Sequence, residues 1–421
     1  MKPPPFPPFR PGFWRSPLRG PWLTTVLGTL LLCGVTVVAL TGFLSHAAYE
    51  PGLGRNGIVD PSRDLPLGIG WPAGPAWLYG LTQGLHVNIG LATVPLLLAK
   101  LWSVIPRLFA WPPVASPAQA IERGSIALLV SSGVFEFATG IINAQNYYAF
   151  DFRFVPAHYY GAIVFVASLV VHILVKLPVM VRAYRERGLL MPLRDDLAHT
   201  RPEPPDPDGL VASDPAAPTI SRRGLLGFVG AGSALLLLAN AGETIGGPLR
   251  RLSLLAPRSG DPGPGPNGFQ VNKTAAGAGV KREMTGDGYR LVLRSGDREL
   301  RLTRADLLAM EQRTETLPIA CVEGWTTTQD WTGVPLASFA ELIGAAAAGE
   351  LLVESLQAGG TFRQVTLSRT QFGNERALLA LKVNGADLSL DHGFPARVIV
   401  PALPGVHNTK WVAAMTFKGA A

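Results

Sequence analysis

The stretch Leu317–Leu336, LPIACVEGWTTTQDWTGVPL, holds one of the two cysteines in the 421-residue chain. Cys321 stands here in polar, turn-forming surroundings, whereas Cys33 lies in an apolar run, so we expect no disulfide between them. A buried structural thiol is the commonest form of an unpaired cysteine. A thiolate in polar surroundings also suits a soft metal ion. This stretch alone leaves both roles open for Cys321.

The composition points to a membrane protein. Hydrophobic residues make up 48% of the chain and charged residues 16%, a balance that favours membrane spans over a wholly soluble protein. The net charge of +7 is of the kind that cytoplasmic loops of membrane proteins carry, and the sequence shows no basic-aromatic patch typical of nucleic-acid binding. We therefore expect membrane lipid, and no nucleic acid, among the partners of this protein.

Five apolar runs, each close to the ~20 residues that span a bilayer, precede the region around Cys321. They begin at Trp22, Pro75, Ser125, His158 and Gly224. One such run alone is compatible with a buried core helix. Five together predict a membrane α-helical bundle of four spans, followed by a fifth span that acts as an anchor.

Basic residues predict the orientation of these spans. Lysines and arginines gather before the first run, between the second and third, and between the fourth and fifth, whereas the other loops hold few, namely Arg55, Arg63 and Arg153. The positive-inside rule then predicts a multi-pass protein of the cell membrane with a cytoplasmic N-terminus and an extracytoplasmic C-terminal part. Arg222 and Arg223, before the fifth run, resemble a twin-arginine signal, although an ordinary topology signal has the same form.

Changes in composition along the chain indicate its domains. Segments rich in Pro, Gly and Asp begin at Arg201 and Ala256 and predict linkers. From Phe269 onward, short apolar strands alternate with turns and a few helical patches, which predicts an α+β domain of about 150 residues. We expect a Pro-rich cytoplasmic tail at 1–20, a four-helix membrane domain at 21–190, a cytoplasmic linker at 191–220, a twin-arginine-like span at 221–246, a flexible linker at 247–268 and the α+β domain at 269–421.

Histidines in the apolar runs are candidate haem ligands, because polar groups at membrane depth are costly and often functional. His86 and His172 fall about 15 Å and about 21 Å from the outer ends of their spans. Bis-imidazole ligation of haem b needs one histidine from each of two facing helices. His158 and His46 are weaker candidates for a second, outer haem. This placement resembles the four-helix b-type cytochromes of membrane oxidoreductases; a simple hydrogen bond between helices is the alternative for any one histidine.

Several motifs after Phe269 resemble the molybdopterin domain of the sulfite oxidase superfamily. They are CVEGW and WTGVPL around Cys321, then KVNGADLSLDHGFPAR and HNTKW further along, and FQVNKTAAGAG at the start. The resemblance covers about Phe269 to Phe417 and implies that Cys321 is the thiolate ligand of molybdenum. It further implies cofactor contacts at Asn272, Ala275, Ala276, Ser355, His392, Arg397, Asn408, Thr409 and Lys410. We also expect Trp325 and Trp331 to wall the pocket, unless either is simply a core residue.

Departures from the sulfite oxidase pattern bear on the substrate. Val271-Asn272-Lys273 replaces an Arg-Asn-His stretch, Leu381 stands near the position of the active-site tyrosine, and Gly324 and Trp325 stand where a second substrate arginine is expected. The chain also ends soon after the KW pair, without an immunoglobulin-like dimerisation domain. These features resemble the catalytic subunits of periplasmic methionine sulfoxide reductases.

The resemblance implies a membrane-bound, molybdopterin-dependent oxidoreductase that transfers an oxygen atom on a small extracytoplasmic substrate, with reduction of a sulfoxide favoured. Its electrons would be exchanged with the quinone pool, or another respiratory component, through haem b. Two alternatives are a sulfite-type dehydrogenase and a non-catalytic electron-transfer or anchor subunit. The intact set of Cys321, His392 and Arg397 argues against the non-catalytic alternative.

Overall fold

The computed structural model describes residues 4–49, 71–114, 116–147, 149–152, 154–206 and 209–419. Arg55, Arg63 and Arg153, which entered the topology prediction, lie outside these described residues. The chain divides into two units. The first comprises Met1–Leu40, Val87–Asn143 and Tyr147–Ala239, and the second comprises Thr41–His86, Ala144–Asn146 and Asn240–Ala421.

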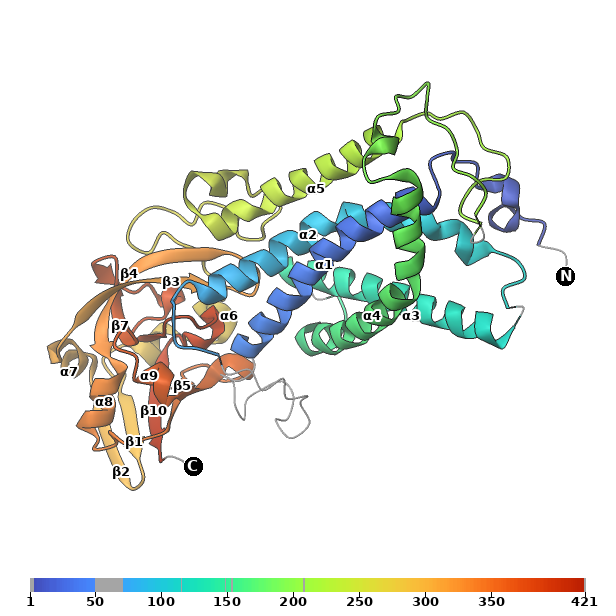
Figure 1. Cartoon of the computed structure of the whole chain (residues 1–421). Coiled ribbons are helices and arrows are strands. Elements are labelled where there is room, and N and C mark those ends of the chain that lie inside the picture. The colour runs from blue at the N-terminus through green and yellow to red at the C-terminus, as the bar shows by residue number, and fades with distance from the viewer. Residues whose placement is uncertain are drawn as a thin grey trace. The chain divides into compact units, whose positions relative to one another are not determined.

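Long helices occupy the N-terminal part of the chain (Figure 1). They are α1 (Pro21–Tyr49), α2 (Leu78–Val104), α3 (Pro117–Ala144), α4 (Phe154–Arg187) and α5 (Arg222–Ile245). Five helices in the described part of the chain are long and apolar enough to cross a membrane, and each contains all or most of one of the five apolar runs. The third span is a longer helix than its apolar run indicated, because its first turns are polar.

A buried carboxylate caps the start of α1 in the first unit. Glu203 accepts hydrogen bonds from the backbone N–H groups of Trp22, at 3.0 Å, and Leu23, at 3.4 Å. These donors have no partner within the helix, and a carboxylate also stabilises the positive end of the helix dipole. Gly20 leaves room for this carboxylate, because a Cβ there would lie 2.4 Å from Cδ of Glu203. The segment before α5 therefore folds against the start of α1.

The arginine pair before α5 has two different environments. Arg222 is buried and donates hydrogen bonds to the carbonyls of Arg201, at 2.8 Å, and Pro17, at 3.3 Å. Arg223 is exposed. Arg222 thus contributes to the packing of the first unit in addition to its positive charge.

Two five-stranded sheets form the C-terminal domain, labelled in Figure 1. One has the order β2-β1-β10-β5-β6, and the other has β3-β4-β7-β8 with β9 also paired to β7. The strands are β1 (Leu291–Ser295), β2 (Arg298–Leu302), β3 (Arg313–Ala320), β4 (Thr326–Pro335), β5 (Glu350–Ser355), β6 (Gln364–Ser368), β7 (Leu378–Val383), β8 (Ala386–Asp387), β9 (Arg397–Ile399) and β10 (Val412–Lys418). Short helices are α6 (Ala275–Ala278), α7 (Arg304–Ala309), α8 (Leu336–Leu342) and α9 (Arg369–Phe372). This confirms the predicted α+β class.

Strand β7 is buried on both of its faces and divides the domain core in two. Leu379 and Leu381 pack into the larger cluster, which joins the two sheets. Leu378 and Ala380 point to the opposite face and pack in the cluster that contains Cys321. This alternation follows from the two-residue period of a strand. The β3–β4–β7 sheet therefore separates the inter-sheet core from the surroundings of the thiol.

Backbone approach between β4 and β7 is unusually close at Gly333. A Cβ at this position would lie 2.1 Å from the carbonyl oxygen of Leu379. The register of the two strands also shifts between Thr332 and Gly333. A glycine inside a strand is typical of such an irregular pairing. Only the absence of a side chain at Gly333 allows β4 to stay in the sheet beside β7.

Candidate active site

Cys321 lies at the tight turn that joins β3 to β4. Its backbone N–H donates to the carbonyl of Trp325 at 3.0 Å, and the Gly324 N–H donates back to the carbonyl of Cys321 at 3.0 Å. Gly324 has a φ of +96°, a left-handed conformation that glycine adopts without strain. We name Cys321–Trp325 the thiol loop. The thiol itself is buried, with 4% of the residue exposed.

A pocket beside the thiol is lined by residues from four separate parts of the domain. The lining residues are Phe269, Gln270, Asn272, Ile319, Cys321, Trp325, Arg397 and Gly405. Three of the predicted site residues, Cys321, Asn272 and Arg397, are therefore brought together around one cavity. Of the two tryptophans expected to wall the pocket, Trp325 lines it, whereas Trp331 is fully buried in the core under the guanidinium of Arg397.

Sequence reasoning did not select Gln270, Ile319 and Gly405, which also line the pocket. Gln270 lies within the opening segment FQVNKTAAGAG, so its place in that segment was the one available signal. Ile319 precedes Cys321 by two residues. Because side chains along a strand repeat every two residues, these two lie on the same side. Gly405 carries no side-chain signal at all.

The protein environment keeps the thiol of Cys321 protonated. Burial raises its pKa to about 12, and the neighbouring Glu323 carboxylate acts in the same direction. At neutral pH the group is therefore a neutral thiol as long as only protein surrounds it. Coordination to a metal cation supplies the positive charge that deprotonates such a group. The site favours a thiol that ionises on coordination over one that reacts freely as a nucleophile.

Two cations, Arg397 and Lys410, are buried in the same domain, with 3% and 7% of their surface exposed. Arg397 donates to the carbonyl of His392 at 3.2 Å, and Lys410 donates to the carbonyls of Lys273 at 2.9 Å and Asp391 at 2.8 Å. Neither forms an ion pair with a carboxylate in the part of the chain that the structure describes. Burial lowers the pKa of Arg397 to about 9 and lowers that of Lys410 well below its usual range. Buried cations without anions are a donor set for an anionic ligand.

Buried polar atoms without hydrogen-bond partners occur in the same segments. They are Nε of Arg397, Nδ1 of His407, Nδ2 of Asn408 and Oγ1 of Thr409. Unsatisfied buried polar groups are rare in folded proteins and cost free energy. An anionic, hydrogen-bonding group such as the phosphorylated pterin would satisfy the donors among them, which are Nε of Arg397, Nδ2 of Asn408 and the hydroxyl of Thr409. The residues present therefore fit the molybdopterin that the motifs implied.

Three further predicted contacts lie close to Lys410. Ser355 donates from Oγ to the Lys410 carbonyl at 2.8 Å. The backbone N–H of Ala275 donates to the Asp391 carboxylate at 2.8 Å, and Ala276 is exposed in the single turn of α6. These contacts hold the start of α6 beside the Lys410 segment.

His392 is engaged by the protein through both ring nitrogens. Nδ1 lies 2.8 Å from the Ser389 hydroxyl, and Nε2 lies 3.3 Å from the Phe269 carbonyl. Because a carbonyl can only accept, Nε2 carries the proton and Nδ1 accepts from Ser389. Burial, reinforced by the charge of Arg397, lowers the pKa of His392 to about 4, so the ring is neutral. His392 thus holds Phe269, a wall of the pocket.

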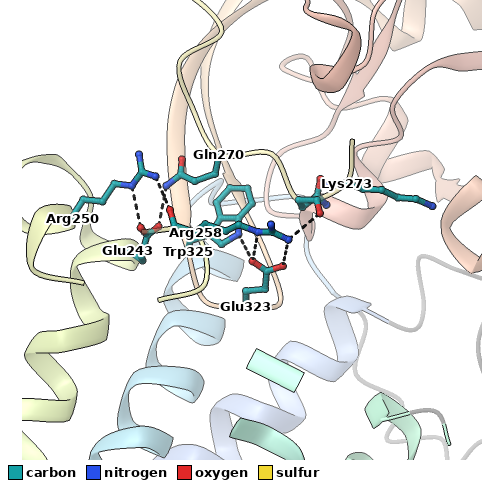
Figure 2. Close-up of polar contacts among 8 residues, drawn as sticks. Glu243, Arg250, Arg258, Gln270, Lys273, Glu323 and Trp325 are labelled. Carbon is teal, nitrogen blue, oxygen red and sulfur yellow. Dashed lines mark hydrogen bonds and ion pairs between the residues drawn. The ribbon is translucent and has the colours of Figure 1, made fainter. Parts of the chain in front are cut away.

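Two buried carboxylates, Glu323 and Glu243, lie next to these pocket walls. Figure 2 shows Arg258 beside Glu323, and Arg250 beside Glu243. Arg258 Nε lies 3.2 Å from Oε2 of Glu323, which also accepts from the Trp325 indole at 2.9 Å. Gln270 donates to Glu243 at 3.1 Å. Neither carboxylate was selected from the sequence as a site residue, although Glu323 stands in the CVEGW motif; Glu243 becomes noticeable only through its burial and its partner.

The four candidate haem ligands lie on three helices. His46 and His86 belong to α1 and α2 in the second unit, and His158 and His172 belong to α4 in the first. Gly42 leaves room for the His86 ring, because a Cβ there would lie 2.7 Å from its Cε1 atom. In the described residues, no group of three or more His, Cys, Asp or Glu side chains could hold a metal ion.

His158 has a buried carboxylate as its partner. Its Nδ1 atom lies 2.9 Å from Thr139 Oγ1 and 3.1 Å from Oε2 of Glu136 on α3. Metal-ligating histidines commonly bond a carboxylate through their second ring nitrogen. Glu136 was not selected from the sequence, although a carboxylate within an apolar run was a sufficient signal.

Comparison with known proteins agrees with the site. The family described as "Oxidoreductase molybdopterin binding domain" matches residues 278–420. Sulfite oxidase of Arabidopsis thaliana is 34% identical over 96 residues, which cover 20% of this chain and 24% of that protein. "Uncharacterized oxidoreductase YuiH" of Bacillus subtilis is 30% identical over 122 residues, covering 29% and 60%. "Putative protein-methionine-sulfoxide reductase subunit YedZ1" of Azospira oryzae is 27% identical over 113 residues, covering 27% and 42%.

The C-terminal domain, with its buried thiol and unpaired cations, is an oxidoreductase molybdopterin-binding domain. Its sequence is similar to parts of sulfite oxidase of Arabidopsis thaliana and of the YuiH oxidoreductase of Bacillus subtilis. The chain spans less than two thirds of the length of each of these three relatives. Asn272, Ala275 and Ala276 precede the matched residues, whereas the other predicted contacts of this domain lie within them.

The buried histidines predict a loss of stability in acid. Burial lowers the pKa of His407, whose Nε2 donates to the Tyr49 carbonyl at 2.8 Å, to about 4. The unfolded chain binds a proton near pH 6.5 and the folded chain does not, so stability is full above pH 6.5 and falls as the pH drops towards 4. In His407→Gln the side chain keeps a hydrogen-bond donor but cannot titrate. The variant should therefore avoid up to about 3 kcal/mol of the acid-dependent loss in the free energy of unfolding.

Melting temperatures of the full-length protein at pH 7 and pH 4.5 measure the effect. A His407→Gln protein with the wild-type acid sensitivity would contradict the assignment of this loss to His407.

Proposed function

We propose that this protein is a membrane-bound, molybdenum cofactor-dependent oxidoreductase that reduces a small sulfoxide-type substrate outside the cytoplasm, with electrons from the quinone pool passing through haem b. The observation that carries the proposal is the buried Cys321 thiol facing a pocket that also contains the unpaired Arg397. When bound, the molybdenum cofactor supplies oxygen-atom transfer chemistry. Reduction of one sulfoxide consumes two electrons and two protons and yields one sulfide and one water.

The residues that would hold the cofactor have separate tasks. Cys321 would ligate molybdenum through its sulfur. Arg397 and Lys410 would neutralise the phosphate of the pterin, with Asn408 and Thr409 donating to its polar atoms. Asn272, Ala275, Ala276, Ser355 and His392 would form or support the cofactor-binding surface. The thiol loop would keep the ligand in place and shield it from water.

The pocket lining supports a neutral substrate. Phe269, Ile319 and Trp325 are apolar, Gln270 and Asn272 are neutral amides, and Arg397 is the one charged lining residue. A neutral sulfoxide needs a hydrogen-bond donor for its oxygen and apolar walls for its substituents. An anion such as sulfite needs more than one cation, and Arg397 is already required by the cofactor phosphate. A sulfite-type dehydrogenase is therefore the second candidate, and a direct test with sulfite and sulfoxides separates the two.

Replacement of the thiol tests the molybdenum assignment. Cys321→Ser exchanges a soft thiolate for a hydroxyl that stays protonated. Loss of an outer-sphere partner of a metal lowers activity by up to about a hundredfold, so loss of a ligand should lower turnover with a sulfoxide by at least that factor. The Mo(V) electron paramagnetic resonance signal should change, while pterin content is retained through Arg397 and Lys410. Cys33→Ser, at the exposed cysteine of α1, is the matched control. Normal turnover and an unaltered signal in Cys321→Ser would show that the thiol is structural.

Haem ligation in the helices is proposed for His86 and His172, with His158 and His46 as a second pair. Supporting observations are the room that Gly42 leaves for the His86 ring and the carboxylate partner of His158. His86→Ala and His172→Ala should each remove the reduced-minus-oxidised haem absorbance of detergent-purified protein, while the molybdenum content stays at the wild-type level. His199→Ala, outside the apolar helices, should keep the full spectrum. Full haem absorbance in His172→Ala would refute its assignment as a ligand.

The same proposal includes a membrane topology. The C-terminal domain after Gly247 would lie outside the cytoplasm, and Arg222–Arg223 would act as its export signal. A reporter fused at Ala421 that works only after export should be active in the wild type. Changing both arginines to Lys should trap it inside, because a twin-arginine route requires the guanidinium groups, whereas a topology signal tolerates lysine. Arg182 and Arg185 changed to Lys form the control pair. Unchanged export in the Arg222–Arg223 variant would leave the pair as a topology signal alone.

A further inference from the structure

The thiol loop is held by residues from outside the C-terminal domain. In the second unit, Gln83 of α2 donates from Nε2 to the Val322 carbonyl at 2.6 Å. Thr244, at the end of α5, donates from Oγ1 to the Gly324 carbonyl at 2.6 Å. Both bonds are short and involve neutral donors. The two carbonyls on either side of Glu323 are thus bonded to two different apolar helices.

Charged contacts fix the remaining part of the loop. Arg258 binds the Glu323 carboxylate through Nε at 3.2 Å and Nη2 at 3.4 Å, and it also donates to the Asn272 carbonyl at 3.1 Å. Figure 2 shows this arginine reaching across between Glu323 and the segment that carries Lys273. A guanidinium that binds a carboxylate through two nitrogens limits the freedom of both groups. The loop is therefore fixed at Val322, Glu323 and Gly324.

The start of α2 packs against the strands that flank the loop. Tyr79 is 1% exposed and lies in one apolar cluster with Ala48 of α1 and Ala320 at the end of β3. Gly80 permits this approach, because a Cβ there would lie 3.2 Å from Thr326 Oγ1 at the start of β4. The hydrogen bond from Gln83 therefore belongs to a packed contact and is not an isolated one.

Helix geometry places Gln83 next to His86. Residues three apart lie on neighbouring positions of the same helix face, about one turn from each other. The His86 ring lies close to Gly42 of α1, and Gln83 reaches the thiol loop. One turn of helix and one short hydrogen bond thus separate a proposed haem ligand from the residue that follows Cys321.

We propose that Gln83 couples the helix bearing His86 to the thiol loop and that electrons pass between haem and the pocket along this contact. The inference rests on the proposed function, since it requires haem at His86 and the cofactor at Cys321. Quinol oxidation supplies two electrons and two protons, the haem passes the electrons singly, and sulfoxide reduction consumes two electrons and two protons and releases water. Gln83 is a positioning residue that contacts neither substrate nor reacting atoms.

A Gln83→Leu variant tests this coupling, because leucine keeps helix propensity and approximate size but has no donor. Haem absorbance and molybdenum content should stay at the wild-type level. After reduction with a quinol analogue and rapid mixing with a methyl sulfoxide, haem reoxidation should slow several-fold. In protein produced without molybdate, hydrogen exchange of the peptide 317–331 should become faster, a readout that does not depend on turnover.

Two controls separate coupling from general loosening. Gln145→Leu removes a similar amide-to-carbonyl bond, from Gln145 Nε2 to the Leu255 carbonyl at 2.9 Å, away from the loop, and should leave both readouts unchanged. Thr244→Val frees the other side of the thiol loop without touching α2, and should raise exchange but slow haem reoxidation less than Gln83→Leu. Equal slowing in both variants, or none in Gln83→Leu, would overturn the inference. A wild-type protein without haem absorbance, or whose haem a sulfoxide cannot reoxidise, would instead overturn the proposed function.

Discussion

Arg397 and Lys410 are buried without an ion-paired carboxylate among the residues that the structure describes, and this is the constraint on which the C-terminal domain depends. Removing a cation from water is costly unless an opposite charge compensates it. Among the described residues, these two side chains donate their hydrogen bonds to backbone carbonyls, and each also lies over a tryptophan ring. Unpaired polar atoms on the adjacent Asn408 and Thr409 add to this cost. An anionic cofactor removes the imbalance, so binding it also stabilises the folded domain.

The sheets explain why the thiol can lie beside these cations. Strand β7 separates two apolar clusters, and Cys321 is in the cluster on the face away from the inter-sheet core. Its position at a turn, closed by hydrogen bonds between Cys321, Gly324 and Trp325, places sulfur at the end of a strand rather than within it. Arg397 starts β9, which pairs with β7. Strands of the same sheet thus place the Cys321 thiol and the Arg397 guanidinium beside one pocket.

In the second unit, residues of apolar helices are part of this site. Gln83 and Thr244 hold the thiol loop, Glu243 holds Gln270, and Tyr49 accepts a hydrogen bond from His407 beside the Asn408 segment. A domain joined to the helices by a flexible linker alone would lack such contacts. Arg250 and Arg258, from the segment between α5 and the domain, neutralise the two carboxylates that these contacts bury. The geometry of the pocket therefore depends on the helices as well as on the sheets.

The sequence by itself determined the five apolar helices, the α+β class and the thiol with its cationic companions, because these depend on local composition and on motifs within a few residues. Tertiary structure alone decided that Gln83 bonds Val322, 239 positions away, and that Thr244 bonds Gly324, 80 positions away. It also decided that Arg258 pairs with Glu323, and that Gly42 and Gly333 are sites of close approach. A hydrogen bond or a steric limit depends on atoms a few ångströms apart, and one sequence carries no signal of which distant segments meet.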